Sequence, residues 1–122
     1  MAALAEALLS AKERRALERF ARELEDGLGA DLRGVWLYGS RARGERTGPG
    51  SDVDLLVVTA TRRDHDPVRA ALDRATEAEG ANRFFFSLQI WDLEELADDR
   101  GVERFFIQEV DRDRVVVAGT DG

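Results

Sequence analysis

Residues 38–58 read YGSRARGERTGPGSDVDLLVV and join one short apolar run to another through a loop rich in glycine and arginine. The loop ends in Asp52 and Asp54, which stand directly before and within the start of the second run. Because successive side chains of a strand alternate between its faces, we expect Asp52 and Asp54 on the same side, roughly 6.6 Å apart at about 3.3 Å per residue. Two carboxylates so placed suit a hard cation such as Mg²⁺ or Mn²⁺, whose remaining positions take waters or phosphates.

The loop between these runs offers groups that bind phosphate. Gly39 allows the backbone to approach a ligand closely, and Ser40 adds a hydroxyl and an amide. A short helix beginning after Ser40 would favour an anion at its N-terminus. Arg41, Arg43 and Arg46 can neutralise a triphosphate or a leaving pyrophosphate. The stretch therefore predicts a cradle for Mg²⁺ and a nucleoside triphosphate.

The residues on either side of this stretch predict alternating helices and strands. We expect helix over about 4–28, with a break where Ser10 and Glu13 form a capping box. The other expected elements are strands over 35–38, 53–59, 84–91 and 114–118, and helices from Asp66 to Gly80, after Asp92 and after Gly101. The run 53–59 is apolar on both faces after Asp54, which is typical of a central strand. The order predicts one α+β domain over residues 1–122, a mixed β-sheet with helices packed on it.

Composition excludes several classes of protein. The chain has 122 residues, 43% of them apolar and 35% charged, with no cysteine, so disulfide frameworks and thiolate metal sites are excluded. No run of about 18 apolar residues predicts a membrane span, and the N-terminus lacks the basic start of a signal peptide. The net charge of −7 argues against direct nucleic-acid binding. A cytoplasmic protein is expected.

The loop and the two aspartates together closely resemble the signature of the minimal nucleotidyltransferases, a small branch of the DNA polymerase beta superfamily. The matching positions are Gly39, Ser40, Arg41, Arg43, Gly44, Ser51, Asp52 and Asp54. The resemblance implies a nucleotidyltransferase fold and transfer of a nucleoside monophosphate, AMP from ATP being the expected case. It assigns Asp52 and Asp54 as catalytic metal ligands, and Gly39, Ser40, Arg41, Arg43 and Ser51 to the nucleotide. It also implies a partner, because many members are antitoxins of helical HEPN-domain toxins and some transfer AMP to that toxin.

The family's usual third carboxylate is missing from the expected next strand, FFFSLQIW over residues 84–91. When the stretch QIWDLEEL, residues 89–96, is aligned with the strand that carries the third aspartate in the family, Gln89 stands at the third position. Ser87 is the other candidate, because its side chain has the same parity as that of Gln89. Neither side chain is a general base at neutral pH, a role that typically contributes about 10²–10⁴-fold. Asp92 has the opposite parity and is better explained as a helix cap.

Two functions of different kinds follow. The first is a metal-dependent transferase acting on a partner protein, and the second is a binding module that neutralises a partner sterically with the degenerate fold. Transfer to a small molecule such as an aminoglycoside is a third, weakened by the lack of an additional helical domain. We expect most of the phenylalanines to be core. Since three consecutive residues, Phe84–Phe86, cannot all face one way, one side of that strand needs cover from a helix or another chain.

Overall fold

The structure, a computed structural model, describes residues 9–43, 52–102 and 104–119. The helices are α1 (Ala11–Leu28), α2 (Ser40–Arg43), α3 (Asp66–Glu79), α4 (Leu93–Val102) and α5 (Arg104–Asp113), with 3-10 turns η2 (Gly29–Asp31) and η3 (Arg83–Phe85). The strands are β1 (Leu32–Tyr38), β2 (Val53–Thr59), β3 (Phe86–Asp92) and β4 (Val115–Gly119). In this part of the chain, no helix combines the length and the apolar content that a bilayer crossing requires.

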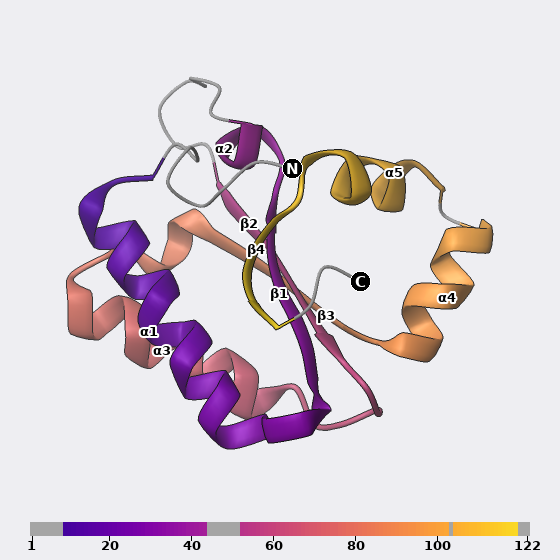
Figure 1. Cartoon of the computed structure of the whole chain (residues 1–122). Coiled ribbons are helices and arrows are strands. Elements are labelled where there is room, and N and C mark those ends of the chain that lie inside the picture. The colour runs from indigo at the N-terminus through magenta and orange to yellow at the C-terminus, as the bar shows by residue number, and fades with distance from the viewer. Residues whose placement is uncertain (1–8, 44–51, 103, 120–122) are drawn as a thin grey trace.

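The strands form one mixed sheet in the order β3-β2-β1-β4. β1 is antiparallel to β2 and to β4, whereas β2 and β3 run parallel and are joined by the crossover that contains α3. Figure 1 shows α1 and α3 on one side of the sheet and α4 and α5 on the other. The expected α+β architecture, a mixed sheet with helices packed on it, is confirmed.

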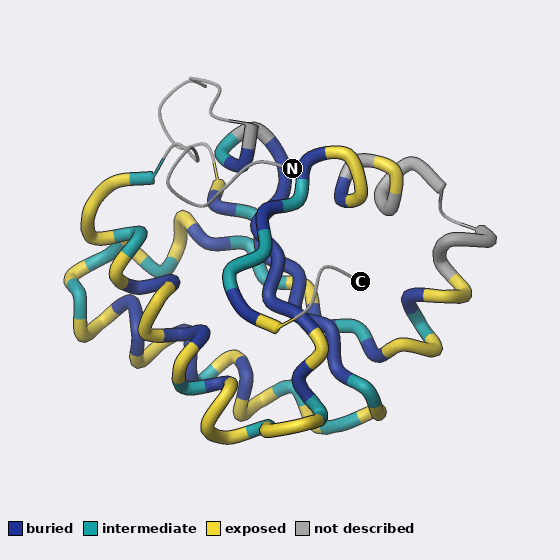
Figure 2. The backbone as a smooth tube through the Cα atoms, in the orientation of Figure 1, coloured by how far each residue is buried: buried dark blue, intermediate teal, exposed yellow. Residues whose placement is uncertain are grey.

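β2 lies in the interior of the sheet with both of its faces covered, as the apolar pattern predicts. Val53, Leu55 and Val57 belong to a core cluster with side chains of α1 and α3, such as Phe20. Leu56, on the opposite face, belongs to a second cluster that includes side chains of α4 and α5. The central strands β1 and β2 are accordingly the most continuously buried part of the backbone in Figure 2. A stiff, doubly covered strand is a precise support for the aspartates at its start.

Local signals in the sequence account for the helix ends. Ser10 and Glu13 form the expected capping box, with Ser10 N–H donating to Glu13 Oε1 (2.8 Å) and Glu13 N–H to Ser10 Oγ (3.1 Å). The part of the predicted first helix over residues 4–8 lies outside the described residues. Gly80 ends α3 in the left-handed conformation, with φ of 70°, and the Asp92–Glu95 cap of α4 is present, with Glu95 N–H 2.8 Å from Asp92 Oδ1.

Three predicted boundaries are wrong. β1 begins at Leu32 rather than residue 35, because Gly34 is paired on both sides, with Val58 and with Gly119. A helix cap was also expected at Asp66, whereas Asp66 is the first residue of α3 and its N–H donates to the Asp64 carboxylate at 3.0 Å.

The third wrong boundary is at the start of β3. Residues 84 and 85 belong to the turn η3, because the side chain of Asn82 accepts the N–H of Phe84 and caps that turn. Neither phenylalanine is core: Phe84 is 91% exposed and Phe85 41%.

Candidate active site

The candidate site lies at the end of the sheet where the loop between β1 and β2 begins and ends. β1 finishes at Tyr38, α2 begins at Ser40 and β2 begins at Val53. In the antiparallel register, Tyr38 pairs with Asp54. The two halves of the quoted motif, separated in sequence by the loop, therefore meet at one edge, close to α2 in Figure 1.

Gly39 and Asp54 are in direct proximity. Gly39 has a φ of +79°, and a Cβ built on it would lie only 2.6 Å from Asp54 Oδ2. A side chain at position 39 would thus be strained by the backbone and would displace the carboxylate. Glycine is required here because the Asp54 carboxylate occupies the space over its Cα. The position of the Asp54 carboxylate therefore depends on the absence of a side chain at Gly39.

The sheet register identifies the neighbour of Asp54 on β3. Asp54 is half-buried and pairs with Ser87, whereas Gln89 pairs with Leu56, two residues farther along β2. Ser87 is half-buried and Gln89 exposed. Of the two substitutes for a third carboxylate, Ser87 therefore stands at the position beside Asp54. The sequence alignment had placed Gln89 there.

Asp52 immediately precedes β2 and is exposed. Since it lies outside the regular strand, the expected spacing of its carboxylate from that of Asp54 stays a prediction. Among the described residues, no three or more acidic or histidine side chains form a group that could hold a metal ion. The donors that the site offers are the carboxylates of Asp52 and Asp54 and the neutral hydroxyl of Ser87. These hard oxygen atoms fit Mg²⁺ or Mn²⁺ completed by waters and phosphate oxygens.

Arg41, one of the predicted phosphate ligands, contacts α1. Its Nη1 donates to Glu13 Oε1 at 2.9 Å, and the two side chains are only 15% and 12% exposed. Glu13 thus caps α1 and anchors α2 at once. Sequence reasoning recognised Glu13 only as a capping residue, because nothing local in the sequence indicates a partner 28 residues away. Phosphate binding by Arg41 stays a prediction.

The electrostatics of this pair favour the charged form of Glu13. Burial alone would raise the pKa of the Glu13 carboxyl, but hydrogen bonds from Arg41 and Ser10, together with the charge of Arg41, lower it below its ordinary value of 4.5. The ion pair is therefore intact at neutral pH and holds the start of α2 against α1.

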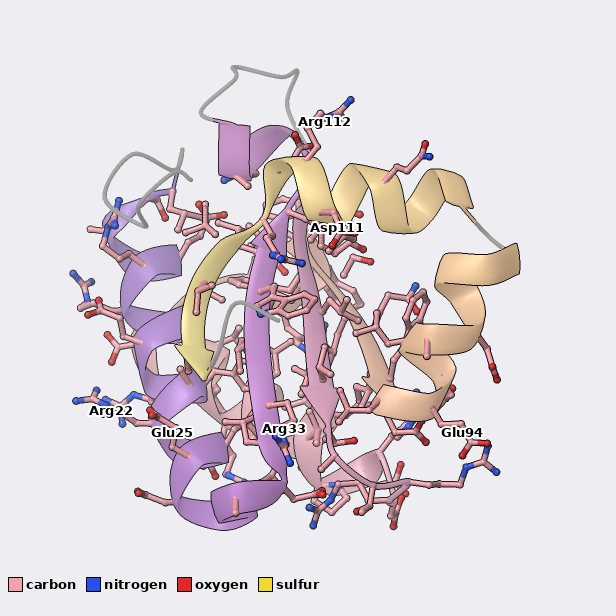
Figure 3. The ribbon with its side chains drawn as sticks, turned by 45° about the vertical axis from the view of Figure 1, so that its right-hand side comes forward. Arg22, Glu25, Arg33, Glu94, Asp111 and Arg112 are labelled. Carbon is pink, nitrogen blue, oxygen red and sulfur yellow. The ribbon has the colours of Figure 1, made fainter. Side chains whose placement is uncertain are left out.

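The remaining predicted ligands are only partly described. Ser40 and Arg43 are the first and last residues of α2, as expected for a short helix after Gly39, but their side chains lie outside the described part of the structure. Ser51 and Arg46 lie outside the described residues altogether. α5 also contacts α2, and Arg112, near the end of α5, lies at this end of the molecule in Figure 3. Its guanidinium donates to Asp113 at 2.8 Å.

A separate surface groove of about 400 Å³ is lined by Arg62, Arg63, Asp64, His65, Asp66, Arg69 and Glu95. It lies past the end of β2, at the opposite end of that strand from Asp52. Arg63 is paired with Asp31 at 2.8 Å, and the 86% exposed Arg62 approaches Asp92 at 3.9 Å. Its cationic and anionic side chains balance, so this groove is not an extension of the phosphate site.

Comparison with known proteins bears on this arrangement. The family described as "Nucleotidyltransferase domain" matches residues 15–117. The chain belongs to this family. The matched segment runs from α1 into β4 and contains every described residue of the candidate site, so the nucleotidyltransferase resemblance and fold inferred from the motif are confirmed.

Solved structures of similar fold include toxin–antitoxin complexes. This nucleotidyltransferase domain is 20% identical to a chain of a variant MntA–HpeT toxin–antitoxin, with a TM-score of 0.51, covering 84% of this chain and 73% of that one. A toxin–antitoxin structure with AMP-PNP has 22% identity and a TM-score of 0.50 over the same shares of the two chains. A Sulfolobus solfataricus protein assigned to the nucleotidyltransferases has 23% identity and a TM-score of 0.50, covering 84% and 77%. No curated protein matches this chain.

Proposed function

We propose that this nucleotidyltransferase domain transfers AMP from ATP to a hydroxyl of a partner protein, and that it acts as the antitoxin of a HEPN-domain toxin in the cytoplasm. The observation that carries the proposal is the contact between Gly39 and the Asp54 carboxylate at the loop of the motif. The two similar toxin–antitoxin complexes, one with AMP-PNP, favour this partner and this donor.

Each residue of the site has a distinct task in the proposed reaction. Asp52 and Asp54 hold Mg²⁺ or Mn²⁺, which when bound neutralises charge on the phosphate oxygens. Gly39 leaves the Asp54 carboxylate in place and lets the backbone approach the phosphates. Ser40, Ser51 and Arg43 complete the binding of the triphosphate, joined by Arg41 where its contact with Glu13 permits.

The chemical step is a displacement at phosphorus. The acceptor oxygen forms a bond to the α-phosphorus of ATP, the bond from that phosphorus to the oxygen bridging the β-phosphate breaks, and pyrophosphate leaves. The acceptor proton passes to solvent, because β3 presents Ser87 and not a carboxylate beside Asp54. We therefore expect a transfer rate lower by about 10²–10⁴-fold than with a general base at that position.

The same β3 observation favours a second candidate function. With a neutral residue in the third position, the domain binds nucleotide and partner but neutralises the toxin sterically, without transfer. In this case Asp52 and Asp54 serve nucleotide binding only.

One experiment separates the two functions. The purified chain is incubated with Mg²⁺, labelled ATP and a HEPN-domain protein that co-purifies with it, and the partner is examined by mass spectrometry. Transfer predicts a gain of one or more AMP groups, lost in Asp52→Asn and Asp54→Asn and kept in the control Asp26→Asn, an exposed aspartate of α1. Binding without any gain in mass supports the steric module, and full activity of both site variants would refute the metal-site assignment.

A further inference from the structure

Two large apolar side chains are exposed at the start of β3. Phe84 is 91% exposed and Phe85 41%. Exposure of a pair of adjacent phenyl rings is unfavourable in water, because removing apolar surface from water lowers the free energy. Neighbouring exposed aromatic side chains can be part of a surface that another molecule covers.

The turn that carries the two rings is braced. Asn82 accepts the N–H of Phe84 through Oδ1 at 3.0 Å and the N–H of Phe85 through its carbonyl at 3.1 Å. The Arg83 guanidinium donates to Asp73 of α3 at 2.8 Å and to the Phe86 carbonyl at 3.1 Å. The rings are thus presented from a fixed turn, so little conformational entropy is lost when a partner covers them.

Among the described strands, β3 is also an edge strand, and its own sequence lacks the features that usually protect an edge. It is the outermost strand beside β2, and residues 86–91 contain no charge and no proline. Its seven residues pair with β2 without a register shift. β4, at the other edge, has five residues and a register shift. Proteins normally shorten, charge or distort exposed edges, and β3 keeps a long, regular edge that is uncharged over residues 86–91.

This surface adjoins the candidate catalytic residues. β2 and β3 are parallel, and Phe86 pairs with Val53, so η3 lies at the same end of the sheet as Asp52. Ser87, the next residue of β3, pairs with Asp54. A segment laid along the outer side of β3 and anchored on the two rings therefore reaches the phosphate-transfer end of the domain.

We propose that Phe84, Phe85 and the outer edge of β3 form the docking surface for the acceptor protein. The inference rests on the proposed function. The occupant is a partner with an apolar pocket for the two rings, a positively charged rim and an extended segment that pairs with β3. The positive rim follows from the net charge of −7 and the exposed Asp52 beside the patch. The same charge on both molecules disfavours a second copy of this chain as the occupant.

The test measures affinity for the same purified HEPN-domain protein. Phe84→Ser and Phe84→Ser/Phe85→Ser are compared with the wild type by calorimetry. Leu93→Ser is the matched control, because Leu93 is 41% exposed, like Phe85, but lies past the far end of β3. We expect the double variant to bind about 30-fold more weakly or worse, the range of interface anchor residues, and the control to bind as the wild type does. Amide hydrogen exchange in β3 slows when the partner is added.

The other outcomes each overturn the proposal. Unchanged affinity in the double variant, or no binding by the wild type, shows that this surface is not the docking site. A loss of AMP-PNP affinity with unchanged partner affinity assigns the rings to the nucleotide base. A dimeric wild type that becomes monomeric on Phe84→Ser assigns the patch to a second copy. Phe84→Ser alone changes a side chain that makes few internal contacts, so its result does not depend on how the double variant folds.

The failure of the proposed function is visible separately. If Asp52→Asn and the wild type both leave the partner without AMP while the phenylalanine variants still lose affinity, transfer is refuted and the docking surface stands. If transfer occurs equally in the wild type and the phenylalanine variants at limiting partner concentration, the docking surface is refuted and transfer stands.

Discussion

Replacing Gly39 by alanine tests whether the glycine is required by its contact with Asp54. The backbone φ of +79° costs an alanine roughly 1–2 kcal/mol. The added Cβ would also lie 2.6 Å from Asp54 Oδ2, and turning that side chain away from its rotamer costs about 0.5–1.5 kcal/mol more. We expect Gly39→Ala to lower the free energy of unfolding by roughly 1.5–3.5 kcal/mol, the sum of these two costs.

Gly80→Ala is the matched control. Gly80 has nearly the same conformation, with φ of +70°, but a Cβ there would meet nothing closer than Lys12 Nζ at 3.8 Å. It therefore carries the backbone cost alone, about 1–2 kcal/mol. Urea unfolding gives both free energies, and calorimetry gives the affinity for AMP-PNP with Mg²⁺.

The two variants differ most in nucleotide affinity. Gly39→Ala should weaken AMP-PNP binding by about tenfold or more, or about 1.4 kcal/mol, because it moves a carboxylate of the proposed metal site. Gly80→Ala should leave that affinity unchanged. If the two alanine variants are equal in stability and in affinity, the close approach of Gly39 and Asp54 has no functional meaning and the site assignment fails.

Three further predictions concern α2 and β3. Glu13→Gln should lower the free energy of unfolding by about 1–3 kcal/mol, a value between those for exposed and for buried ion pairs. Urea unfolding measures this change. The control is Glu18→Gln, which changes an exposed residue of α1. The pKa of Glu13 is below 4.5 in the folded protein. The ionised Glu13 carboxylate therefore stabilises the protein fully when the pH is above the unfolded-state pKa of Glu13. This stabilisation is lost as the pH falls through the folded-state pKa. The difference between wild type and Glu13→Gln should therefore shrink in urea titrations from pH 6 to about pH 3. Ser87→Asp should raise the AMP-transfer rate, by up to about 10²–10⁴-fold, and Gln89→Asp should not; the opposite ranking would show that Gln89 occupies the third position.

Much of this fold is legible in the sequence because its signals are local. The apolar run over 53–59 reproduces β2, and the capping boxes at Ser10 and Asp92 mark the starts of α1 and α4. The motif over 38–58 likewise indicated that Gly39 and Asp54 belong to one site, which the structure brings together.

What the sequence did not predict depends on long-range register. Ser87 and Gln89 have the same parity, so the alternation of β3 cannot say which of them stands beside Asp54. The turn η3 determines which of the two it is. Because η3 occupies residues 83–85, β3 begins only at Phe86, which pairs with Val53, and Ser87 then pairs with Asp54. The exposure of Phe84 and Phe85 was not predicted for the same reason. Three consecutive phenylalanines match a buried strand in the sequence, but the cap that Asn82 provides places the first two of them in the turn η3.

The Glu13 carboxylate accepts hydrogen bonds from both Ser10 and Arg41. Because Arg41 belongs to the segment after β1, a ligand that binds this segment can change the pKa of Glu13. Glu13 is held ionised by Arg41, which follows Gly39 and Ser40 in the motif. Any anion that draws the Arg41 guanidinium away removes the first of the groups that depress the pKa of Glu13, and that pKa then rises. Arrival of a phosphate group at Arg41 would therefore be accompanied by proton uptake by Glu13 at acid pH, and the apparent heat of binding there would change with the ionisation heat of the buffer. A nucleotide that left Arg41 on Glu13 would show no such buffer dependence.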